Sequence, residues 1–71
     1  MKLVYDPEVD VLSVLLSDAA VAESDQDKPG VILDYDDDGN MVGFEILDAS
    51  KRMASPMSVD YGVTLPLRRP A

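Results

Sequence analysis

The Asp38-Gly39 pair, set between two alternating apolar segments, is the feature that most constrains this fold. Asp-Gly is a strong signal for a two-residue β-hairpin turn, and residues 31–36 and 41–47 flank it. The cross-strand pairs that this turn predicts are Tyr35 with Val42, Leu33 with Phe44, and Val31 with Ile46. All three pairs lie on one face, and such alternation is typical of a half-buried antiparallel sheet.

A shorter hairpin is predicted at the N-terminus. Residues 2–5 and 10–16 are β-prone, and the intervening Asp6-Pro7 favours a type I turn, since Asp suits its first position and Pro its second. The register that we expect pairs Tyr5 with Asp10, Leu3 with Leu12, and Met1 with Val14. The apolar residues of this hairpin then also share one face.

The signals between and after the hairpins are weaker. We expect a short strand over residues 21–23 and a loop over residues 25–30, where small, polar and acidic residues prevail. Residues 48–55 can form about two helical turns before the next proline, with Asp48 or Ser50 as the N-cap.

The tail, residues 53–71, follows a core formed by residues 1–52. Apolar residues alternate with polar ones from Val59 to Leu65, which suggests one more strand, and Pro66 limits that strand to an edge position. The expected fold is therefore a single α+β domain over residues 1–71. It is a small antiparallel sheet, a meander of two hairpins with four to five strands, and it carries one short helix.

Composition excludes several classes of function. The 71 residues contain no His and no Cys, which removes disulfides, Cys/His zinc sites and histidine acid/base chemistry. The formal net charge of −8 repels nucleic acid and anionic membranes. The chain shows neither a membrane-spanning stretch nor a signal-peptide pattern. We therefore expect a cytoplasmic protein that is not an enzyme, uses no cofactor, and binds neither nucleic acid nor membrane.

Four motifs in a fixed order carry a resemblance to a known family. They are Tyr5-Asp6-Pro7-Glu8-x-Asp10-x-Leu12, Gly30-Val-Ile-Leu-Asp-Tyr-Asp36, Asp38-Gly39, and Gly43-Phe-Glu-Ile-Leu-Asp48-Ala-Ser50. In these motifs the chain resembles the YuzE-like bacterial proteins, domain-of-unknown-function family 2283, over residues 1–52. The resemblance implies a small bacterial protein with a β-rich α+β fold and no established activity. Members are sometimes encoded beside small toxin-like proteins, so the resemblance also suggests an antitoxin-like role.

Three carboxylates form the candidate polar site. The predicted register places Asp34, Asp36 and Glu45 on one face of the central hairpin, where clustered oxygens are weak candidates for holding Mg²⁺ or Ca²⁺. Alternating acids are also what any solvated strand face carries, and a basic protein partner is a third interpretation. The pattern alone favours the solvated face.

Five apolar residues on the face opposite the main core form the candidate interface. They are Val11, Leu15, Ile32, Met41 and Leu47. A short helix covers only one side of a sheet, so a second copy or a partner protein would cover this face, unless the tail with Tyr61 folds over it. We expect a homodimer.

Two function hypotheses follow. The first is a protein–protein interaction module, antitoxin-like, which binds a small basic partner encoded nearby. The alternative is a regulatory protein with a carboxylate-lined site for a divalent cation or small ligand.

Overall fold

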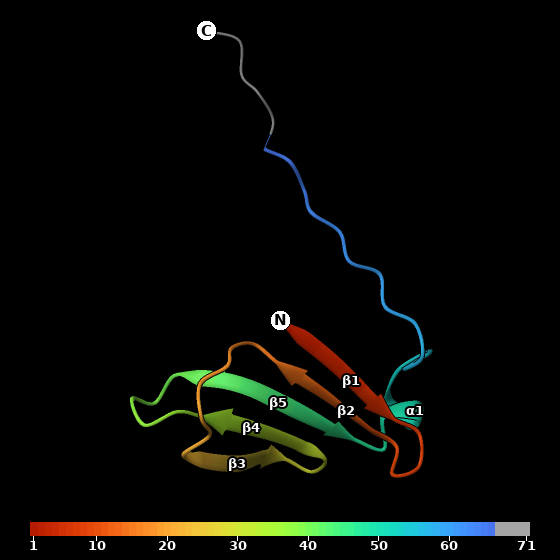
Figure 1. The fold of residues 1–71 in the computed structure, drawn as a ribbon. Helices are drawn as coiled ribbons and strands as arrows, with labels where there is room; N and C mark the ends of the chain where they lie inside the picture. Colours follow the sequence, from red (N-terminus) through yellow and green to blue (C-terminus); the bar gives the residue numbers. More distant parts are fainter. Residues whose placement is uncertain (67–71) are drawn as a thin grey trace, which may run out of the picture.

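The computed structural model describes residues 1–66, which form one antiparallel sheet and one short helix (Figure 1). The elements are β1 (Lys2–Asp6), β2 (Val11–Leu15), β3 (Glu23–Lys28), β4 (Val31–Tyr35), β5 (Met41–Leu47) and α1 (Ala49–Arg52). Their order across the sheet is β1-β2-β5-β4-β3. The predicted α+β class, with a small antiparallel sheet of up to five strands, is confirmed. The two predicted hairpins meet through β2 and β5, so the last strand within the described residues is the central one.

The central hairpin has the predicted register over most of its length. The matching pairs are Val31 with Ile46 and Leu33 with Phe44. After Asp34 the register shifts, so Tyr35 opposes Met41 and not Val42, as we had predicted. The shift originates in a turn that is longer than the expected two residues.

This turn is a three-residue loop over residues 37–39. The Asp36 backbone N–H donates to the Asn40 carbonyl at 2.9 Å, and the Gly39 N–H donates to the Asp36 carbonyl at 3.1 Å. Gly39 has a φ of 82°, the left-handed conformation that ends such loops. The Asp36 carboxylate accepts the backbone N–H groups of Asn40 at 2.9 Å and Asp38 at 3.0 Å. These bonds lower the pKa of Asp36, and the bond from the Asn40 backbone N–H has the largest effect.

The N-terminal hairpin forms, but its predicted register was wrong by two residues. Tyr5 opposes Leu12 and not Asp10, because residues 7–10 form a four-residue loop. Asp10 ends this loop with a φ of 57°, a left-handed conformation that hydrophobic alternation cannot reveal. Since the shift is two residues, each side chain keeps its predicted face.

β3 occupies a segment that we had predicted to be mostly loop. The strand spans Glu23–Lys28, whereas the predictions were a strand over 21–23 and a loop over 25–30. Pro29 and Gly30 alone form the turn into β4, and the Gly30 φ of 81° fits the second central position of a type II turn. All six β3 side chains are exposed, and four are charged. Such an edge discourages pairing with other chains.

Cross-strand pairing divides the sheet into two faces. The first, which we term the apolar face, has two rows of side chains across four strands: Leu3, Val14, Phe44 and Leu33, then Tyr5, Leu12, Ile46 and Val31. The opposite face, the mixed face, has the rows Val4, Ser13, Glu45 and Ile32, then Lys2, Leu15, Gly43 and Asp34. The apolar face therefore carries the residues that a core requires.

The core is nonetheless thin. Among the residues described, the buried apolar ones are Val14, Val42 and Ala49, with exposed fractions of 7%, 4% and 0%. No large side chain in this part of the chain is fully buried. A chain of this size buries only about 60% of its unfolded surface, so a small stability margin is expected.

The helix is shorter than the two turns predicted over residues 48–55. α1 has four residues, and Asp48, at its N-cap, has a φ of 52° and makes no side-chain capping bond. Ser50 lies inside the helix and is not its N-cap. No helix in the described part of the chain is long and apolar enough to span a membrane.

The described part of the tail, residues 53–66, leaves α1 and extends away from the sheet (Figure 1). Residues 57–66 form neither helix nor strand, so the predicted edge strand is absent over this range. The rest of that prediction, over 67–71, lies outside the described residues. Tyr61 borders the apolar face, beside Leu3 and Phe44. The alternative in which Tyr61 covers the second, mixed face was therefore wrong.

Candidate functional site

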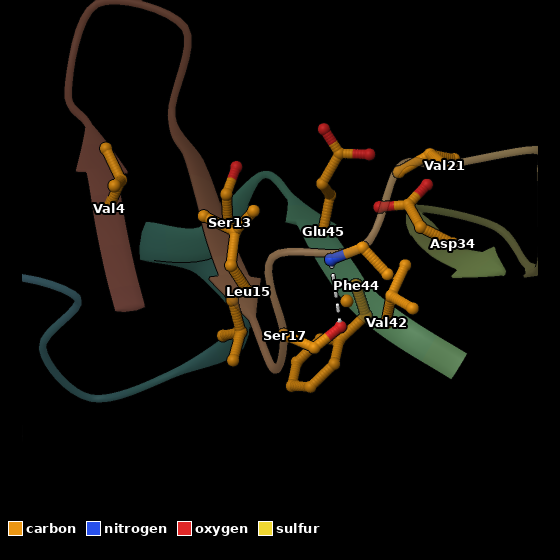
Figure 2. Close-up of a pocket in the computed structure, with 12 residues that line it drawn as sticks. Val4, Ser13, Leu15, Ser17, Val21, Asp34, Val42, Phe44 and Glu45 are labelled. Carbon is orange, nitrogen blue, oxygen red and sulfur yellow. Dashed lines mark hydrogen bonds between the residues drawn. The ribbon is translucent and has the colours of Figure 1, made fainter. Parts of the chain in front are cut away.

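A hollow of about 330 Å³ lies on the mixed face (Figure 2). Four strands and the segment that joins β2 to β3 contribute its walls. Its apolar lining includes Val4, Leu15, Ala19 and Val21, and its polar lining includes Ser13, Ser17, Asp34 and Glu45. The hollow thus combines apolar walls with two carboxylates.

Gly43 lines the hollow and allows β2 and β5 to approach each other closely. A Cβ at this position would lie 2.7 Å from the backbone oxygen of Val14, so no side chain fits without movement of β2 or β5. Gly43 lies between Leu15 on β2 and Asp34 on β4. The side chains of these two residues therefore border an unfilled position.

Asp34 and Glu45 bring negative charge to the hollow. Ile32 opposes Glu45 across β4 and β5, which puts Asp34 diagonal to Glu45 on the same face. The Asp34 carboxylate accepts the Ser24 hydroxyl at 2.6 Å. Figure 2 shows Glu45 and Ser13 projecting to the same side from neighbouring strands. Both carboxylates are half-buried, so an incoming cation would meet them beside apolar surface.

The three carboxylates of the predicted metal site do not come together. Asp36 bonds its own turn, whereas Asp34 and Glu45 border the hollow. Within residues 1–66 no group of three His, Cys, Asp or Glu side chains is placed to hold a metal ion. Calcium and magnesium usually take about six or more oxygen ligands, and this pair of acids supplies few of them.

The five residues of the predicted interface do not form one patch. Cross-strand pairing places Val11, Leu15, Ile32 and Leu47 on the mixed face, whereas Met41 lies beyond the register shift, opposite Tyr35. Ser13 and Glu45 form a polar row across the middle of this face. Leu15 lies on one side of that row, and Val11 and Leu47 lie on the other. Among the five, Leu15 lines the hollow.

A second polar cluster joins the first hairpin to the helix. The Asp10 carboxylate accepts the Tyr5 hydroxyl at 2.7 Å, the Ser50 backbone N–H at 2.9 Å and the Ser50 hydroxyl at 2.6 Å. The Asp10 carbonyl accepts the Ala49 N–H at 2.9 Å. Asp10 therefore performs the helix capping that we had predicted for Asp48 or Ser50.

These bonds set the protonation behaviour of the cluster. Hydrogen bonds from Ser50, then from Tyr5, lower the pKa of Asp10. The bond to Asp10 also raises the pKa of Tyr5 above its ordinary value. An acid with a lowered pKa and occupied oxygens is a poor proton acceptor. The cluster therefore links the first hairpin to α1.

Sequence reasoning missed the bond between Asp10 and Ser50 because 40 residues separate them. Both residues belong to the motifs of the family resemblance, and that was the available signal that they act together. Sequence reasoning also missed the contribution of Ser17 and Val21 to the hollow. Their segment has no periodic pattern from which a position could be predicted.

The sheet, the short helix and the hollow define a small domain of the α+β class. The family model described as "Protein of unknown function (DUF2283)" matches residues 2–50, and the chain belongs to this family. The matched range holds all five strands and the link from Asp10 to Ser50. Neither the comparison with curated proteins nor that with solved structures finds a match.

Proposed function

We propose that this protein is a protein–protein interaction module that takes up a basic side chain of its partner in the hollow on the mixed face. The observation that carries the proposal is the position of Asp34 and Glu45 beside the apolar walls of that hollow. The partner is a small basic protein, and the role is antitoxin-like, in that binding occupies the partner's basic surface.

The lining of the hollow matches the chemistry of a long basic side chain. Lys and Arg combine an apolar stem with a charged head. Val4, Leu15 and Val21 offer contact to the stem, and the two carboxylates offer hydrogen bonds to the head. Arg is favoured because its planar group donates to carboxylates in pairs. A hollow of about 330 Å³ lies at the small end of ligand-pocket volumes, which suits one side chain.

The charge of the whole chain supports a basic partner. A formal net charge of −8 attracts a positive protein over distances beyond contact and speeds its encounter. The same charge opposes binding to phosphate backbones. Complementary charge thus speeds association with the partner and adds specificity to the contacts made inside the hollow.

Titration with short peptides under NMR observation tests the proposal. An Arg-containing peptide should shift the amide resonances of Leu15, Val21 and Gly43, and a Glu-containing peptide of equal length should not. The double variant Asp34→Asn/Glu45→Gln should bind the Arg peptide at least about tenfold more weakly, because the charged partners of the guanidinium are lost.

A matched variant separates site binding from general attraction. Glu23→Gln/Asp25→Asn removes the same charge from exposed positions on β3 and should weaken binding by less than about threefold. Equal weakening by the two double variants, or shifts that lie away from the hollow, would show that the hollow is not the binding site.

A further inference from the structure

Residues 57–66 form an extended arm whose apolar residues recur at every second position. Met57, Val59, Tyr61, Val63 and Leu65 have exposed fractions between 59% and 78%. A period of two is typical of a strand with one apolar side. The arm belongs to no sheet in the described part of the chain. It therefore has the pattern of a segment that covers an apolar surface, but it covers none here.

The apolar face lacks a second layer. Side chains on its inner strands, such as Leu33 and Phe44, are only half-buried, and Leu3 on β1 is 39% exposed. Domains bury a sheet face against another layer of structure, and a four-residue helix is too small to supply one. Val59 and Tyr61 border an open hollow of about 580 Å³ on this face. The arm therefore passes beside this face but leaves it open, and Val59 and Tyr61 stay 59% and 78% exposed.

The areas of the apolar face and of the arm show what can cover them. With strands ~4.8 Å apart and ~17 Å long, the sheet offers a face of roughly 400 Å². A stable interface buries about 800 Å² on each partner. The face alone is too small, and the five apolar side chains of the arm are the surface that can supply the remainder.

We propose that a second copy of this chain covers the apolar face, and that the arm of each copy packs along the apolar face of its partner. A twofold axis allows both contacts at once, because each copy then gives an arm and receives one. The inference concerns the face opposite the hollow and does not depend on the proposed function.

The distribution of charge permits this contact. The eight residues of the apolar face carry no charged side chain, although the chain has a net charge of −8. Asp34 and Glu45 lie on the mixed face. The acids that share the apolar face, Glu23 and Asp25, lie on β3 at the far edge of the sheet. Two copies therefore meet through neutral surface, and added salt weakens the remaining repulsion between them.

The proposed dimer is tested by measuring the mass of the full chain in solution, by light scattering over a range of concentrations. The expected mass is twice that of the 7.7 kDa chain. Val59→Asp/Val63→Asp should raise the dimer dissociation constant at least about tenfold, because apolar contacts become charged. These positions are already exposed, so the monomer should stay folded.

Two controls make the outcome decisive. Ser58→Asp/Thr64→Asp adds the same charge to the polar side of the arm and should change the dissociation constant by less than about threefold. On the sheet, Leu3→Asp should break the dimer and Val4→Asp should not. Leu3 and Val4 are 39% and 42% exposed but lie on opposite faces.

Several outcomes would overturn the inference. They are a monomer at every concentration, equal effects of the two arm variants, and dissociation by Val4→Asp but not by Leu3→Asp. Salt separates this contact from the proposed function: raising NaCl from about 50 to about 500 mM should tighten the dimer and weaken binding of the Arg peptide.

Discussion

Gly43 has two effects at the scale of a single residue. Its missing side chain lets the backbones of β2 and β5 approach, since a Cβ would come within 2.7 Å of the Val14 backbone oxygen. Gly43 also lines the hollow, between Leu15 and Asp34. Strand packing and the candidate site thus depend on one position.

Gly43→Ala should lower the free energy of unfolding by about 1–3 kcal/mol, because a methyl group forced into a packed site displaces the backbone. Urea denaturation measures the change. Gly62→Ala is the matched control, since no atom lies within 4 Å of its added Cβ, and it should change the free energy by less than about 0.5 kcal/mol. Similar values for the two variants would contradict the assigned role of Gly43.

The side to which each residue points was largely predictable from the sequence. Alternation correctly grouped Leu33 with Phe44 and placed Asp34 and Glu45 on the other face. Asp36 was misjudged because its role depends on turn length. A loop one residue longer than expected turns its carboxylate to its own backbone.

At the scale of elements, α1 shows how a helix of four residues is held in place. Isolated helices shorter than about 12 residues are marginal in water. Asp10 bonds the start of α1, and Arg52 near its end donates to the Pro29 carbonyl at 2.7 Å. Tertiary bonds from two different turns therefore hold the helix.

Ser50→Ala should raise the pKa of Asp10 toward its ordinary value, because the Ser50 hydroxyl gives the leading hydrogen bond that lowers it. A lowered folded-state pKa stabilises the protein above the unfolded value of about 3.9, and that stabilisation is lost as the pH falls through the folded value. The melting temperature of Ser50→Ala should therefore lie below that of the native chain at pH 7. The difference between the two melting temperatures should become smaller below about pH 4.

NMR titration of the carboxyl carbon measures the pKa of Asp10 directly. Tyr5→Phe should raise it less than Ser50→Ala does, since the Tyr5 bond is the smaller cause. Ser58→Ala, in the tail, serves as the control and should leave it unchanged. An Asp10 pKa that is the same in all of these variants would contradict the assigned link.

Elements were predictable where the sequence pattern itself fixed them. The two hairpins have alternating apolar residues, whereas Glu23–Lys28 has none, and its strand conformation comes from pairing with β4. The predicted helix ran too far because Met53, whose N–H still donates to the Ala49 carbonyl at 3.1 Å, has an extended backbone that ends the helix after one turn. Registers failed at the turns: the loop over residues 7–10, which ends at the left-handed Asp10, moves the partner of Tyr5 by two residues, and the loop over residues 37–39 moves the partner of Tyr35 by one.

At the scale of the whole molecule, the acidic character of the chain does not by itself make a metal site. Residues 1–66 bring no three candidate ligands together. About 5 mM Mg²⁺, Ca²⁺ or Mn²⁺ should therefore shift the melting temperature by less than about 1 °C, as differential scanning fluorimetry measures it. A larger rise that disappears in Asp34→Asn/Glu45→Gln would instead support the cation-binding hypothesis.

The order of the strands also has a consequence for folding during synthesis on the ribosome. β5 is the central strand of the sheet, yet among residues 1–66 it is the last strand to be synthesised. Until it emerges, the hairpin of β1 and β2 and the pair of β3 and β4 have no strand between them. The nascent chain therefore stays as two unconnected hairpins until β5 joins them in a single late event, and a chain that ends before β5 cannot form the five-stranded sheet.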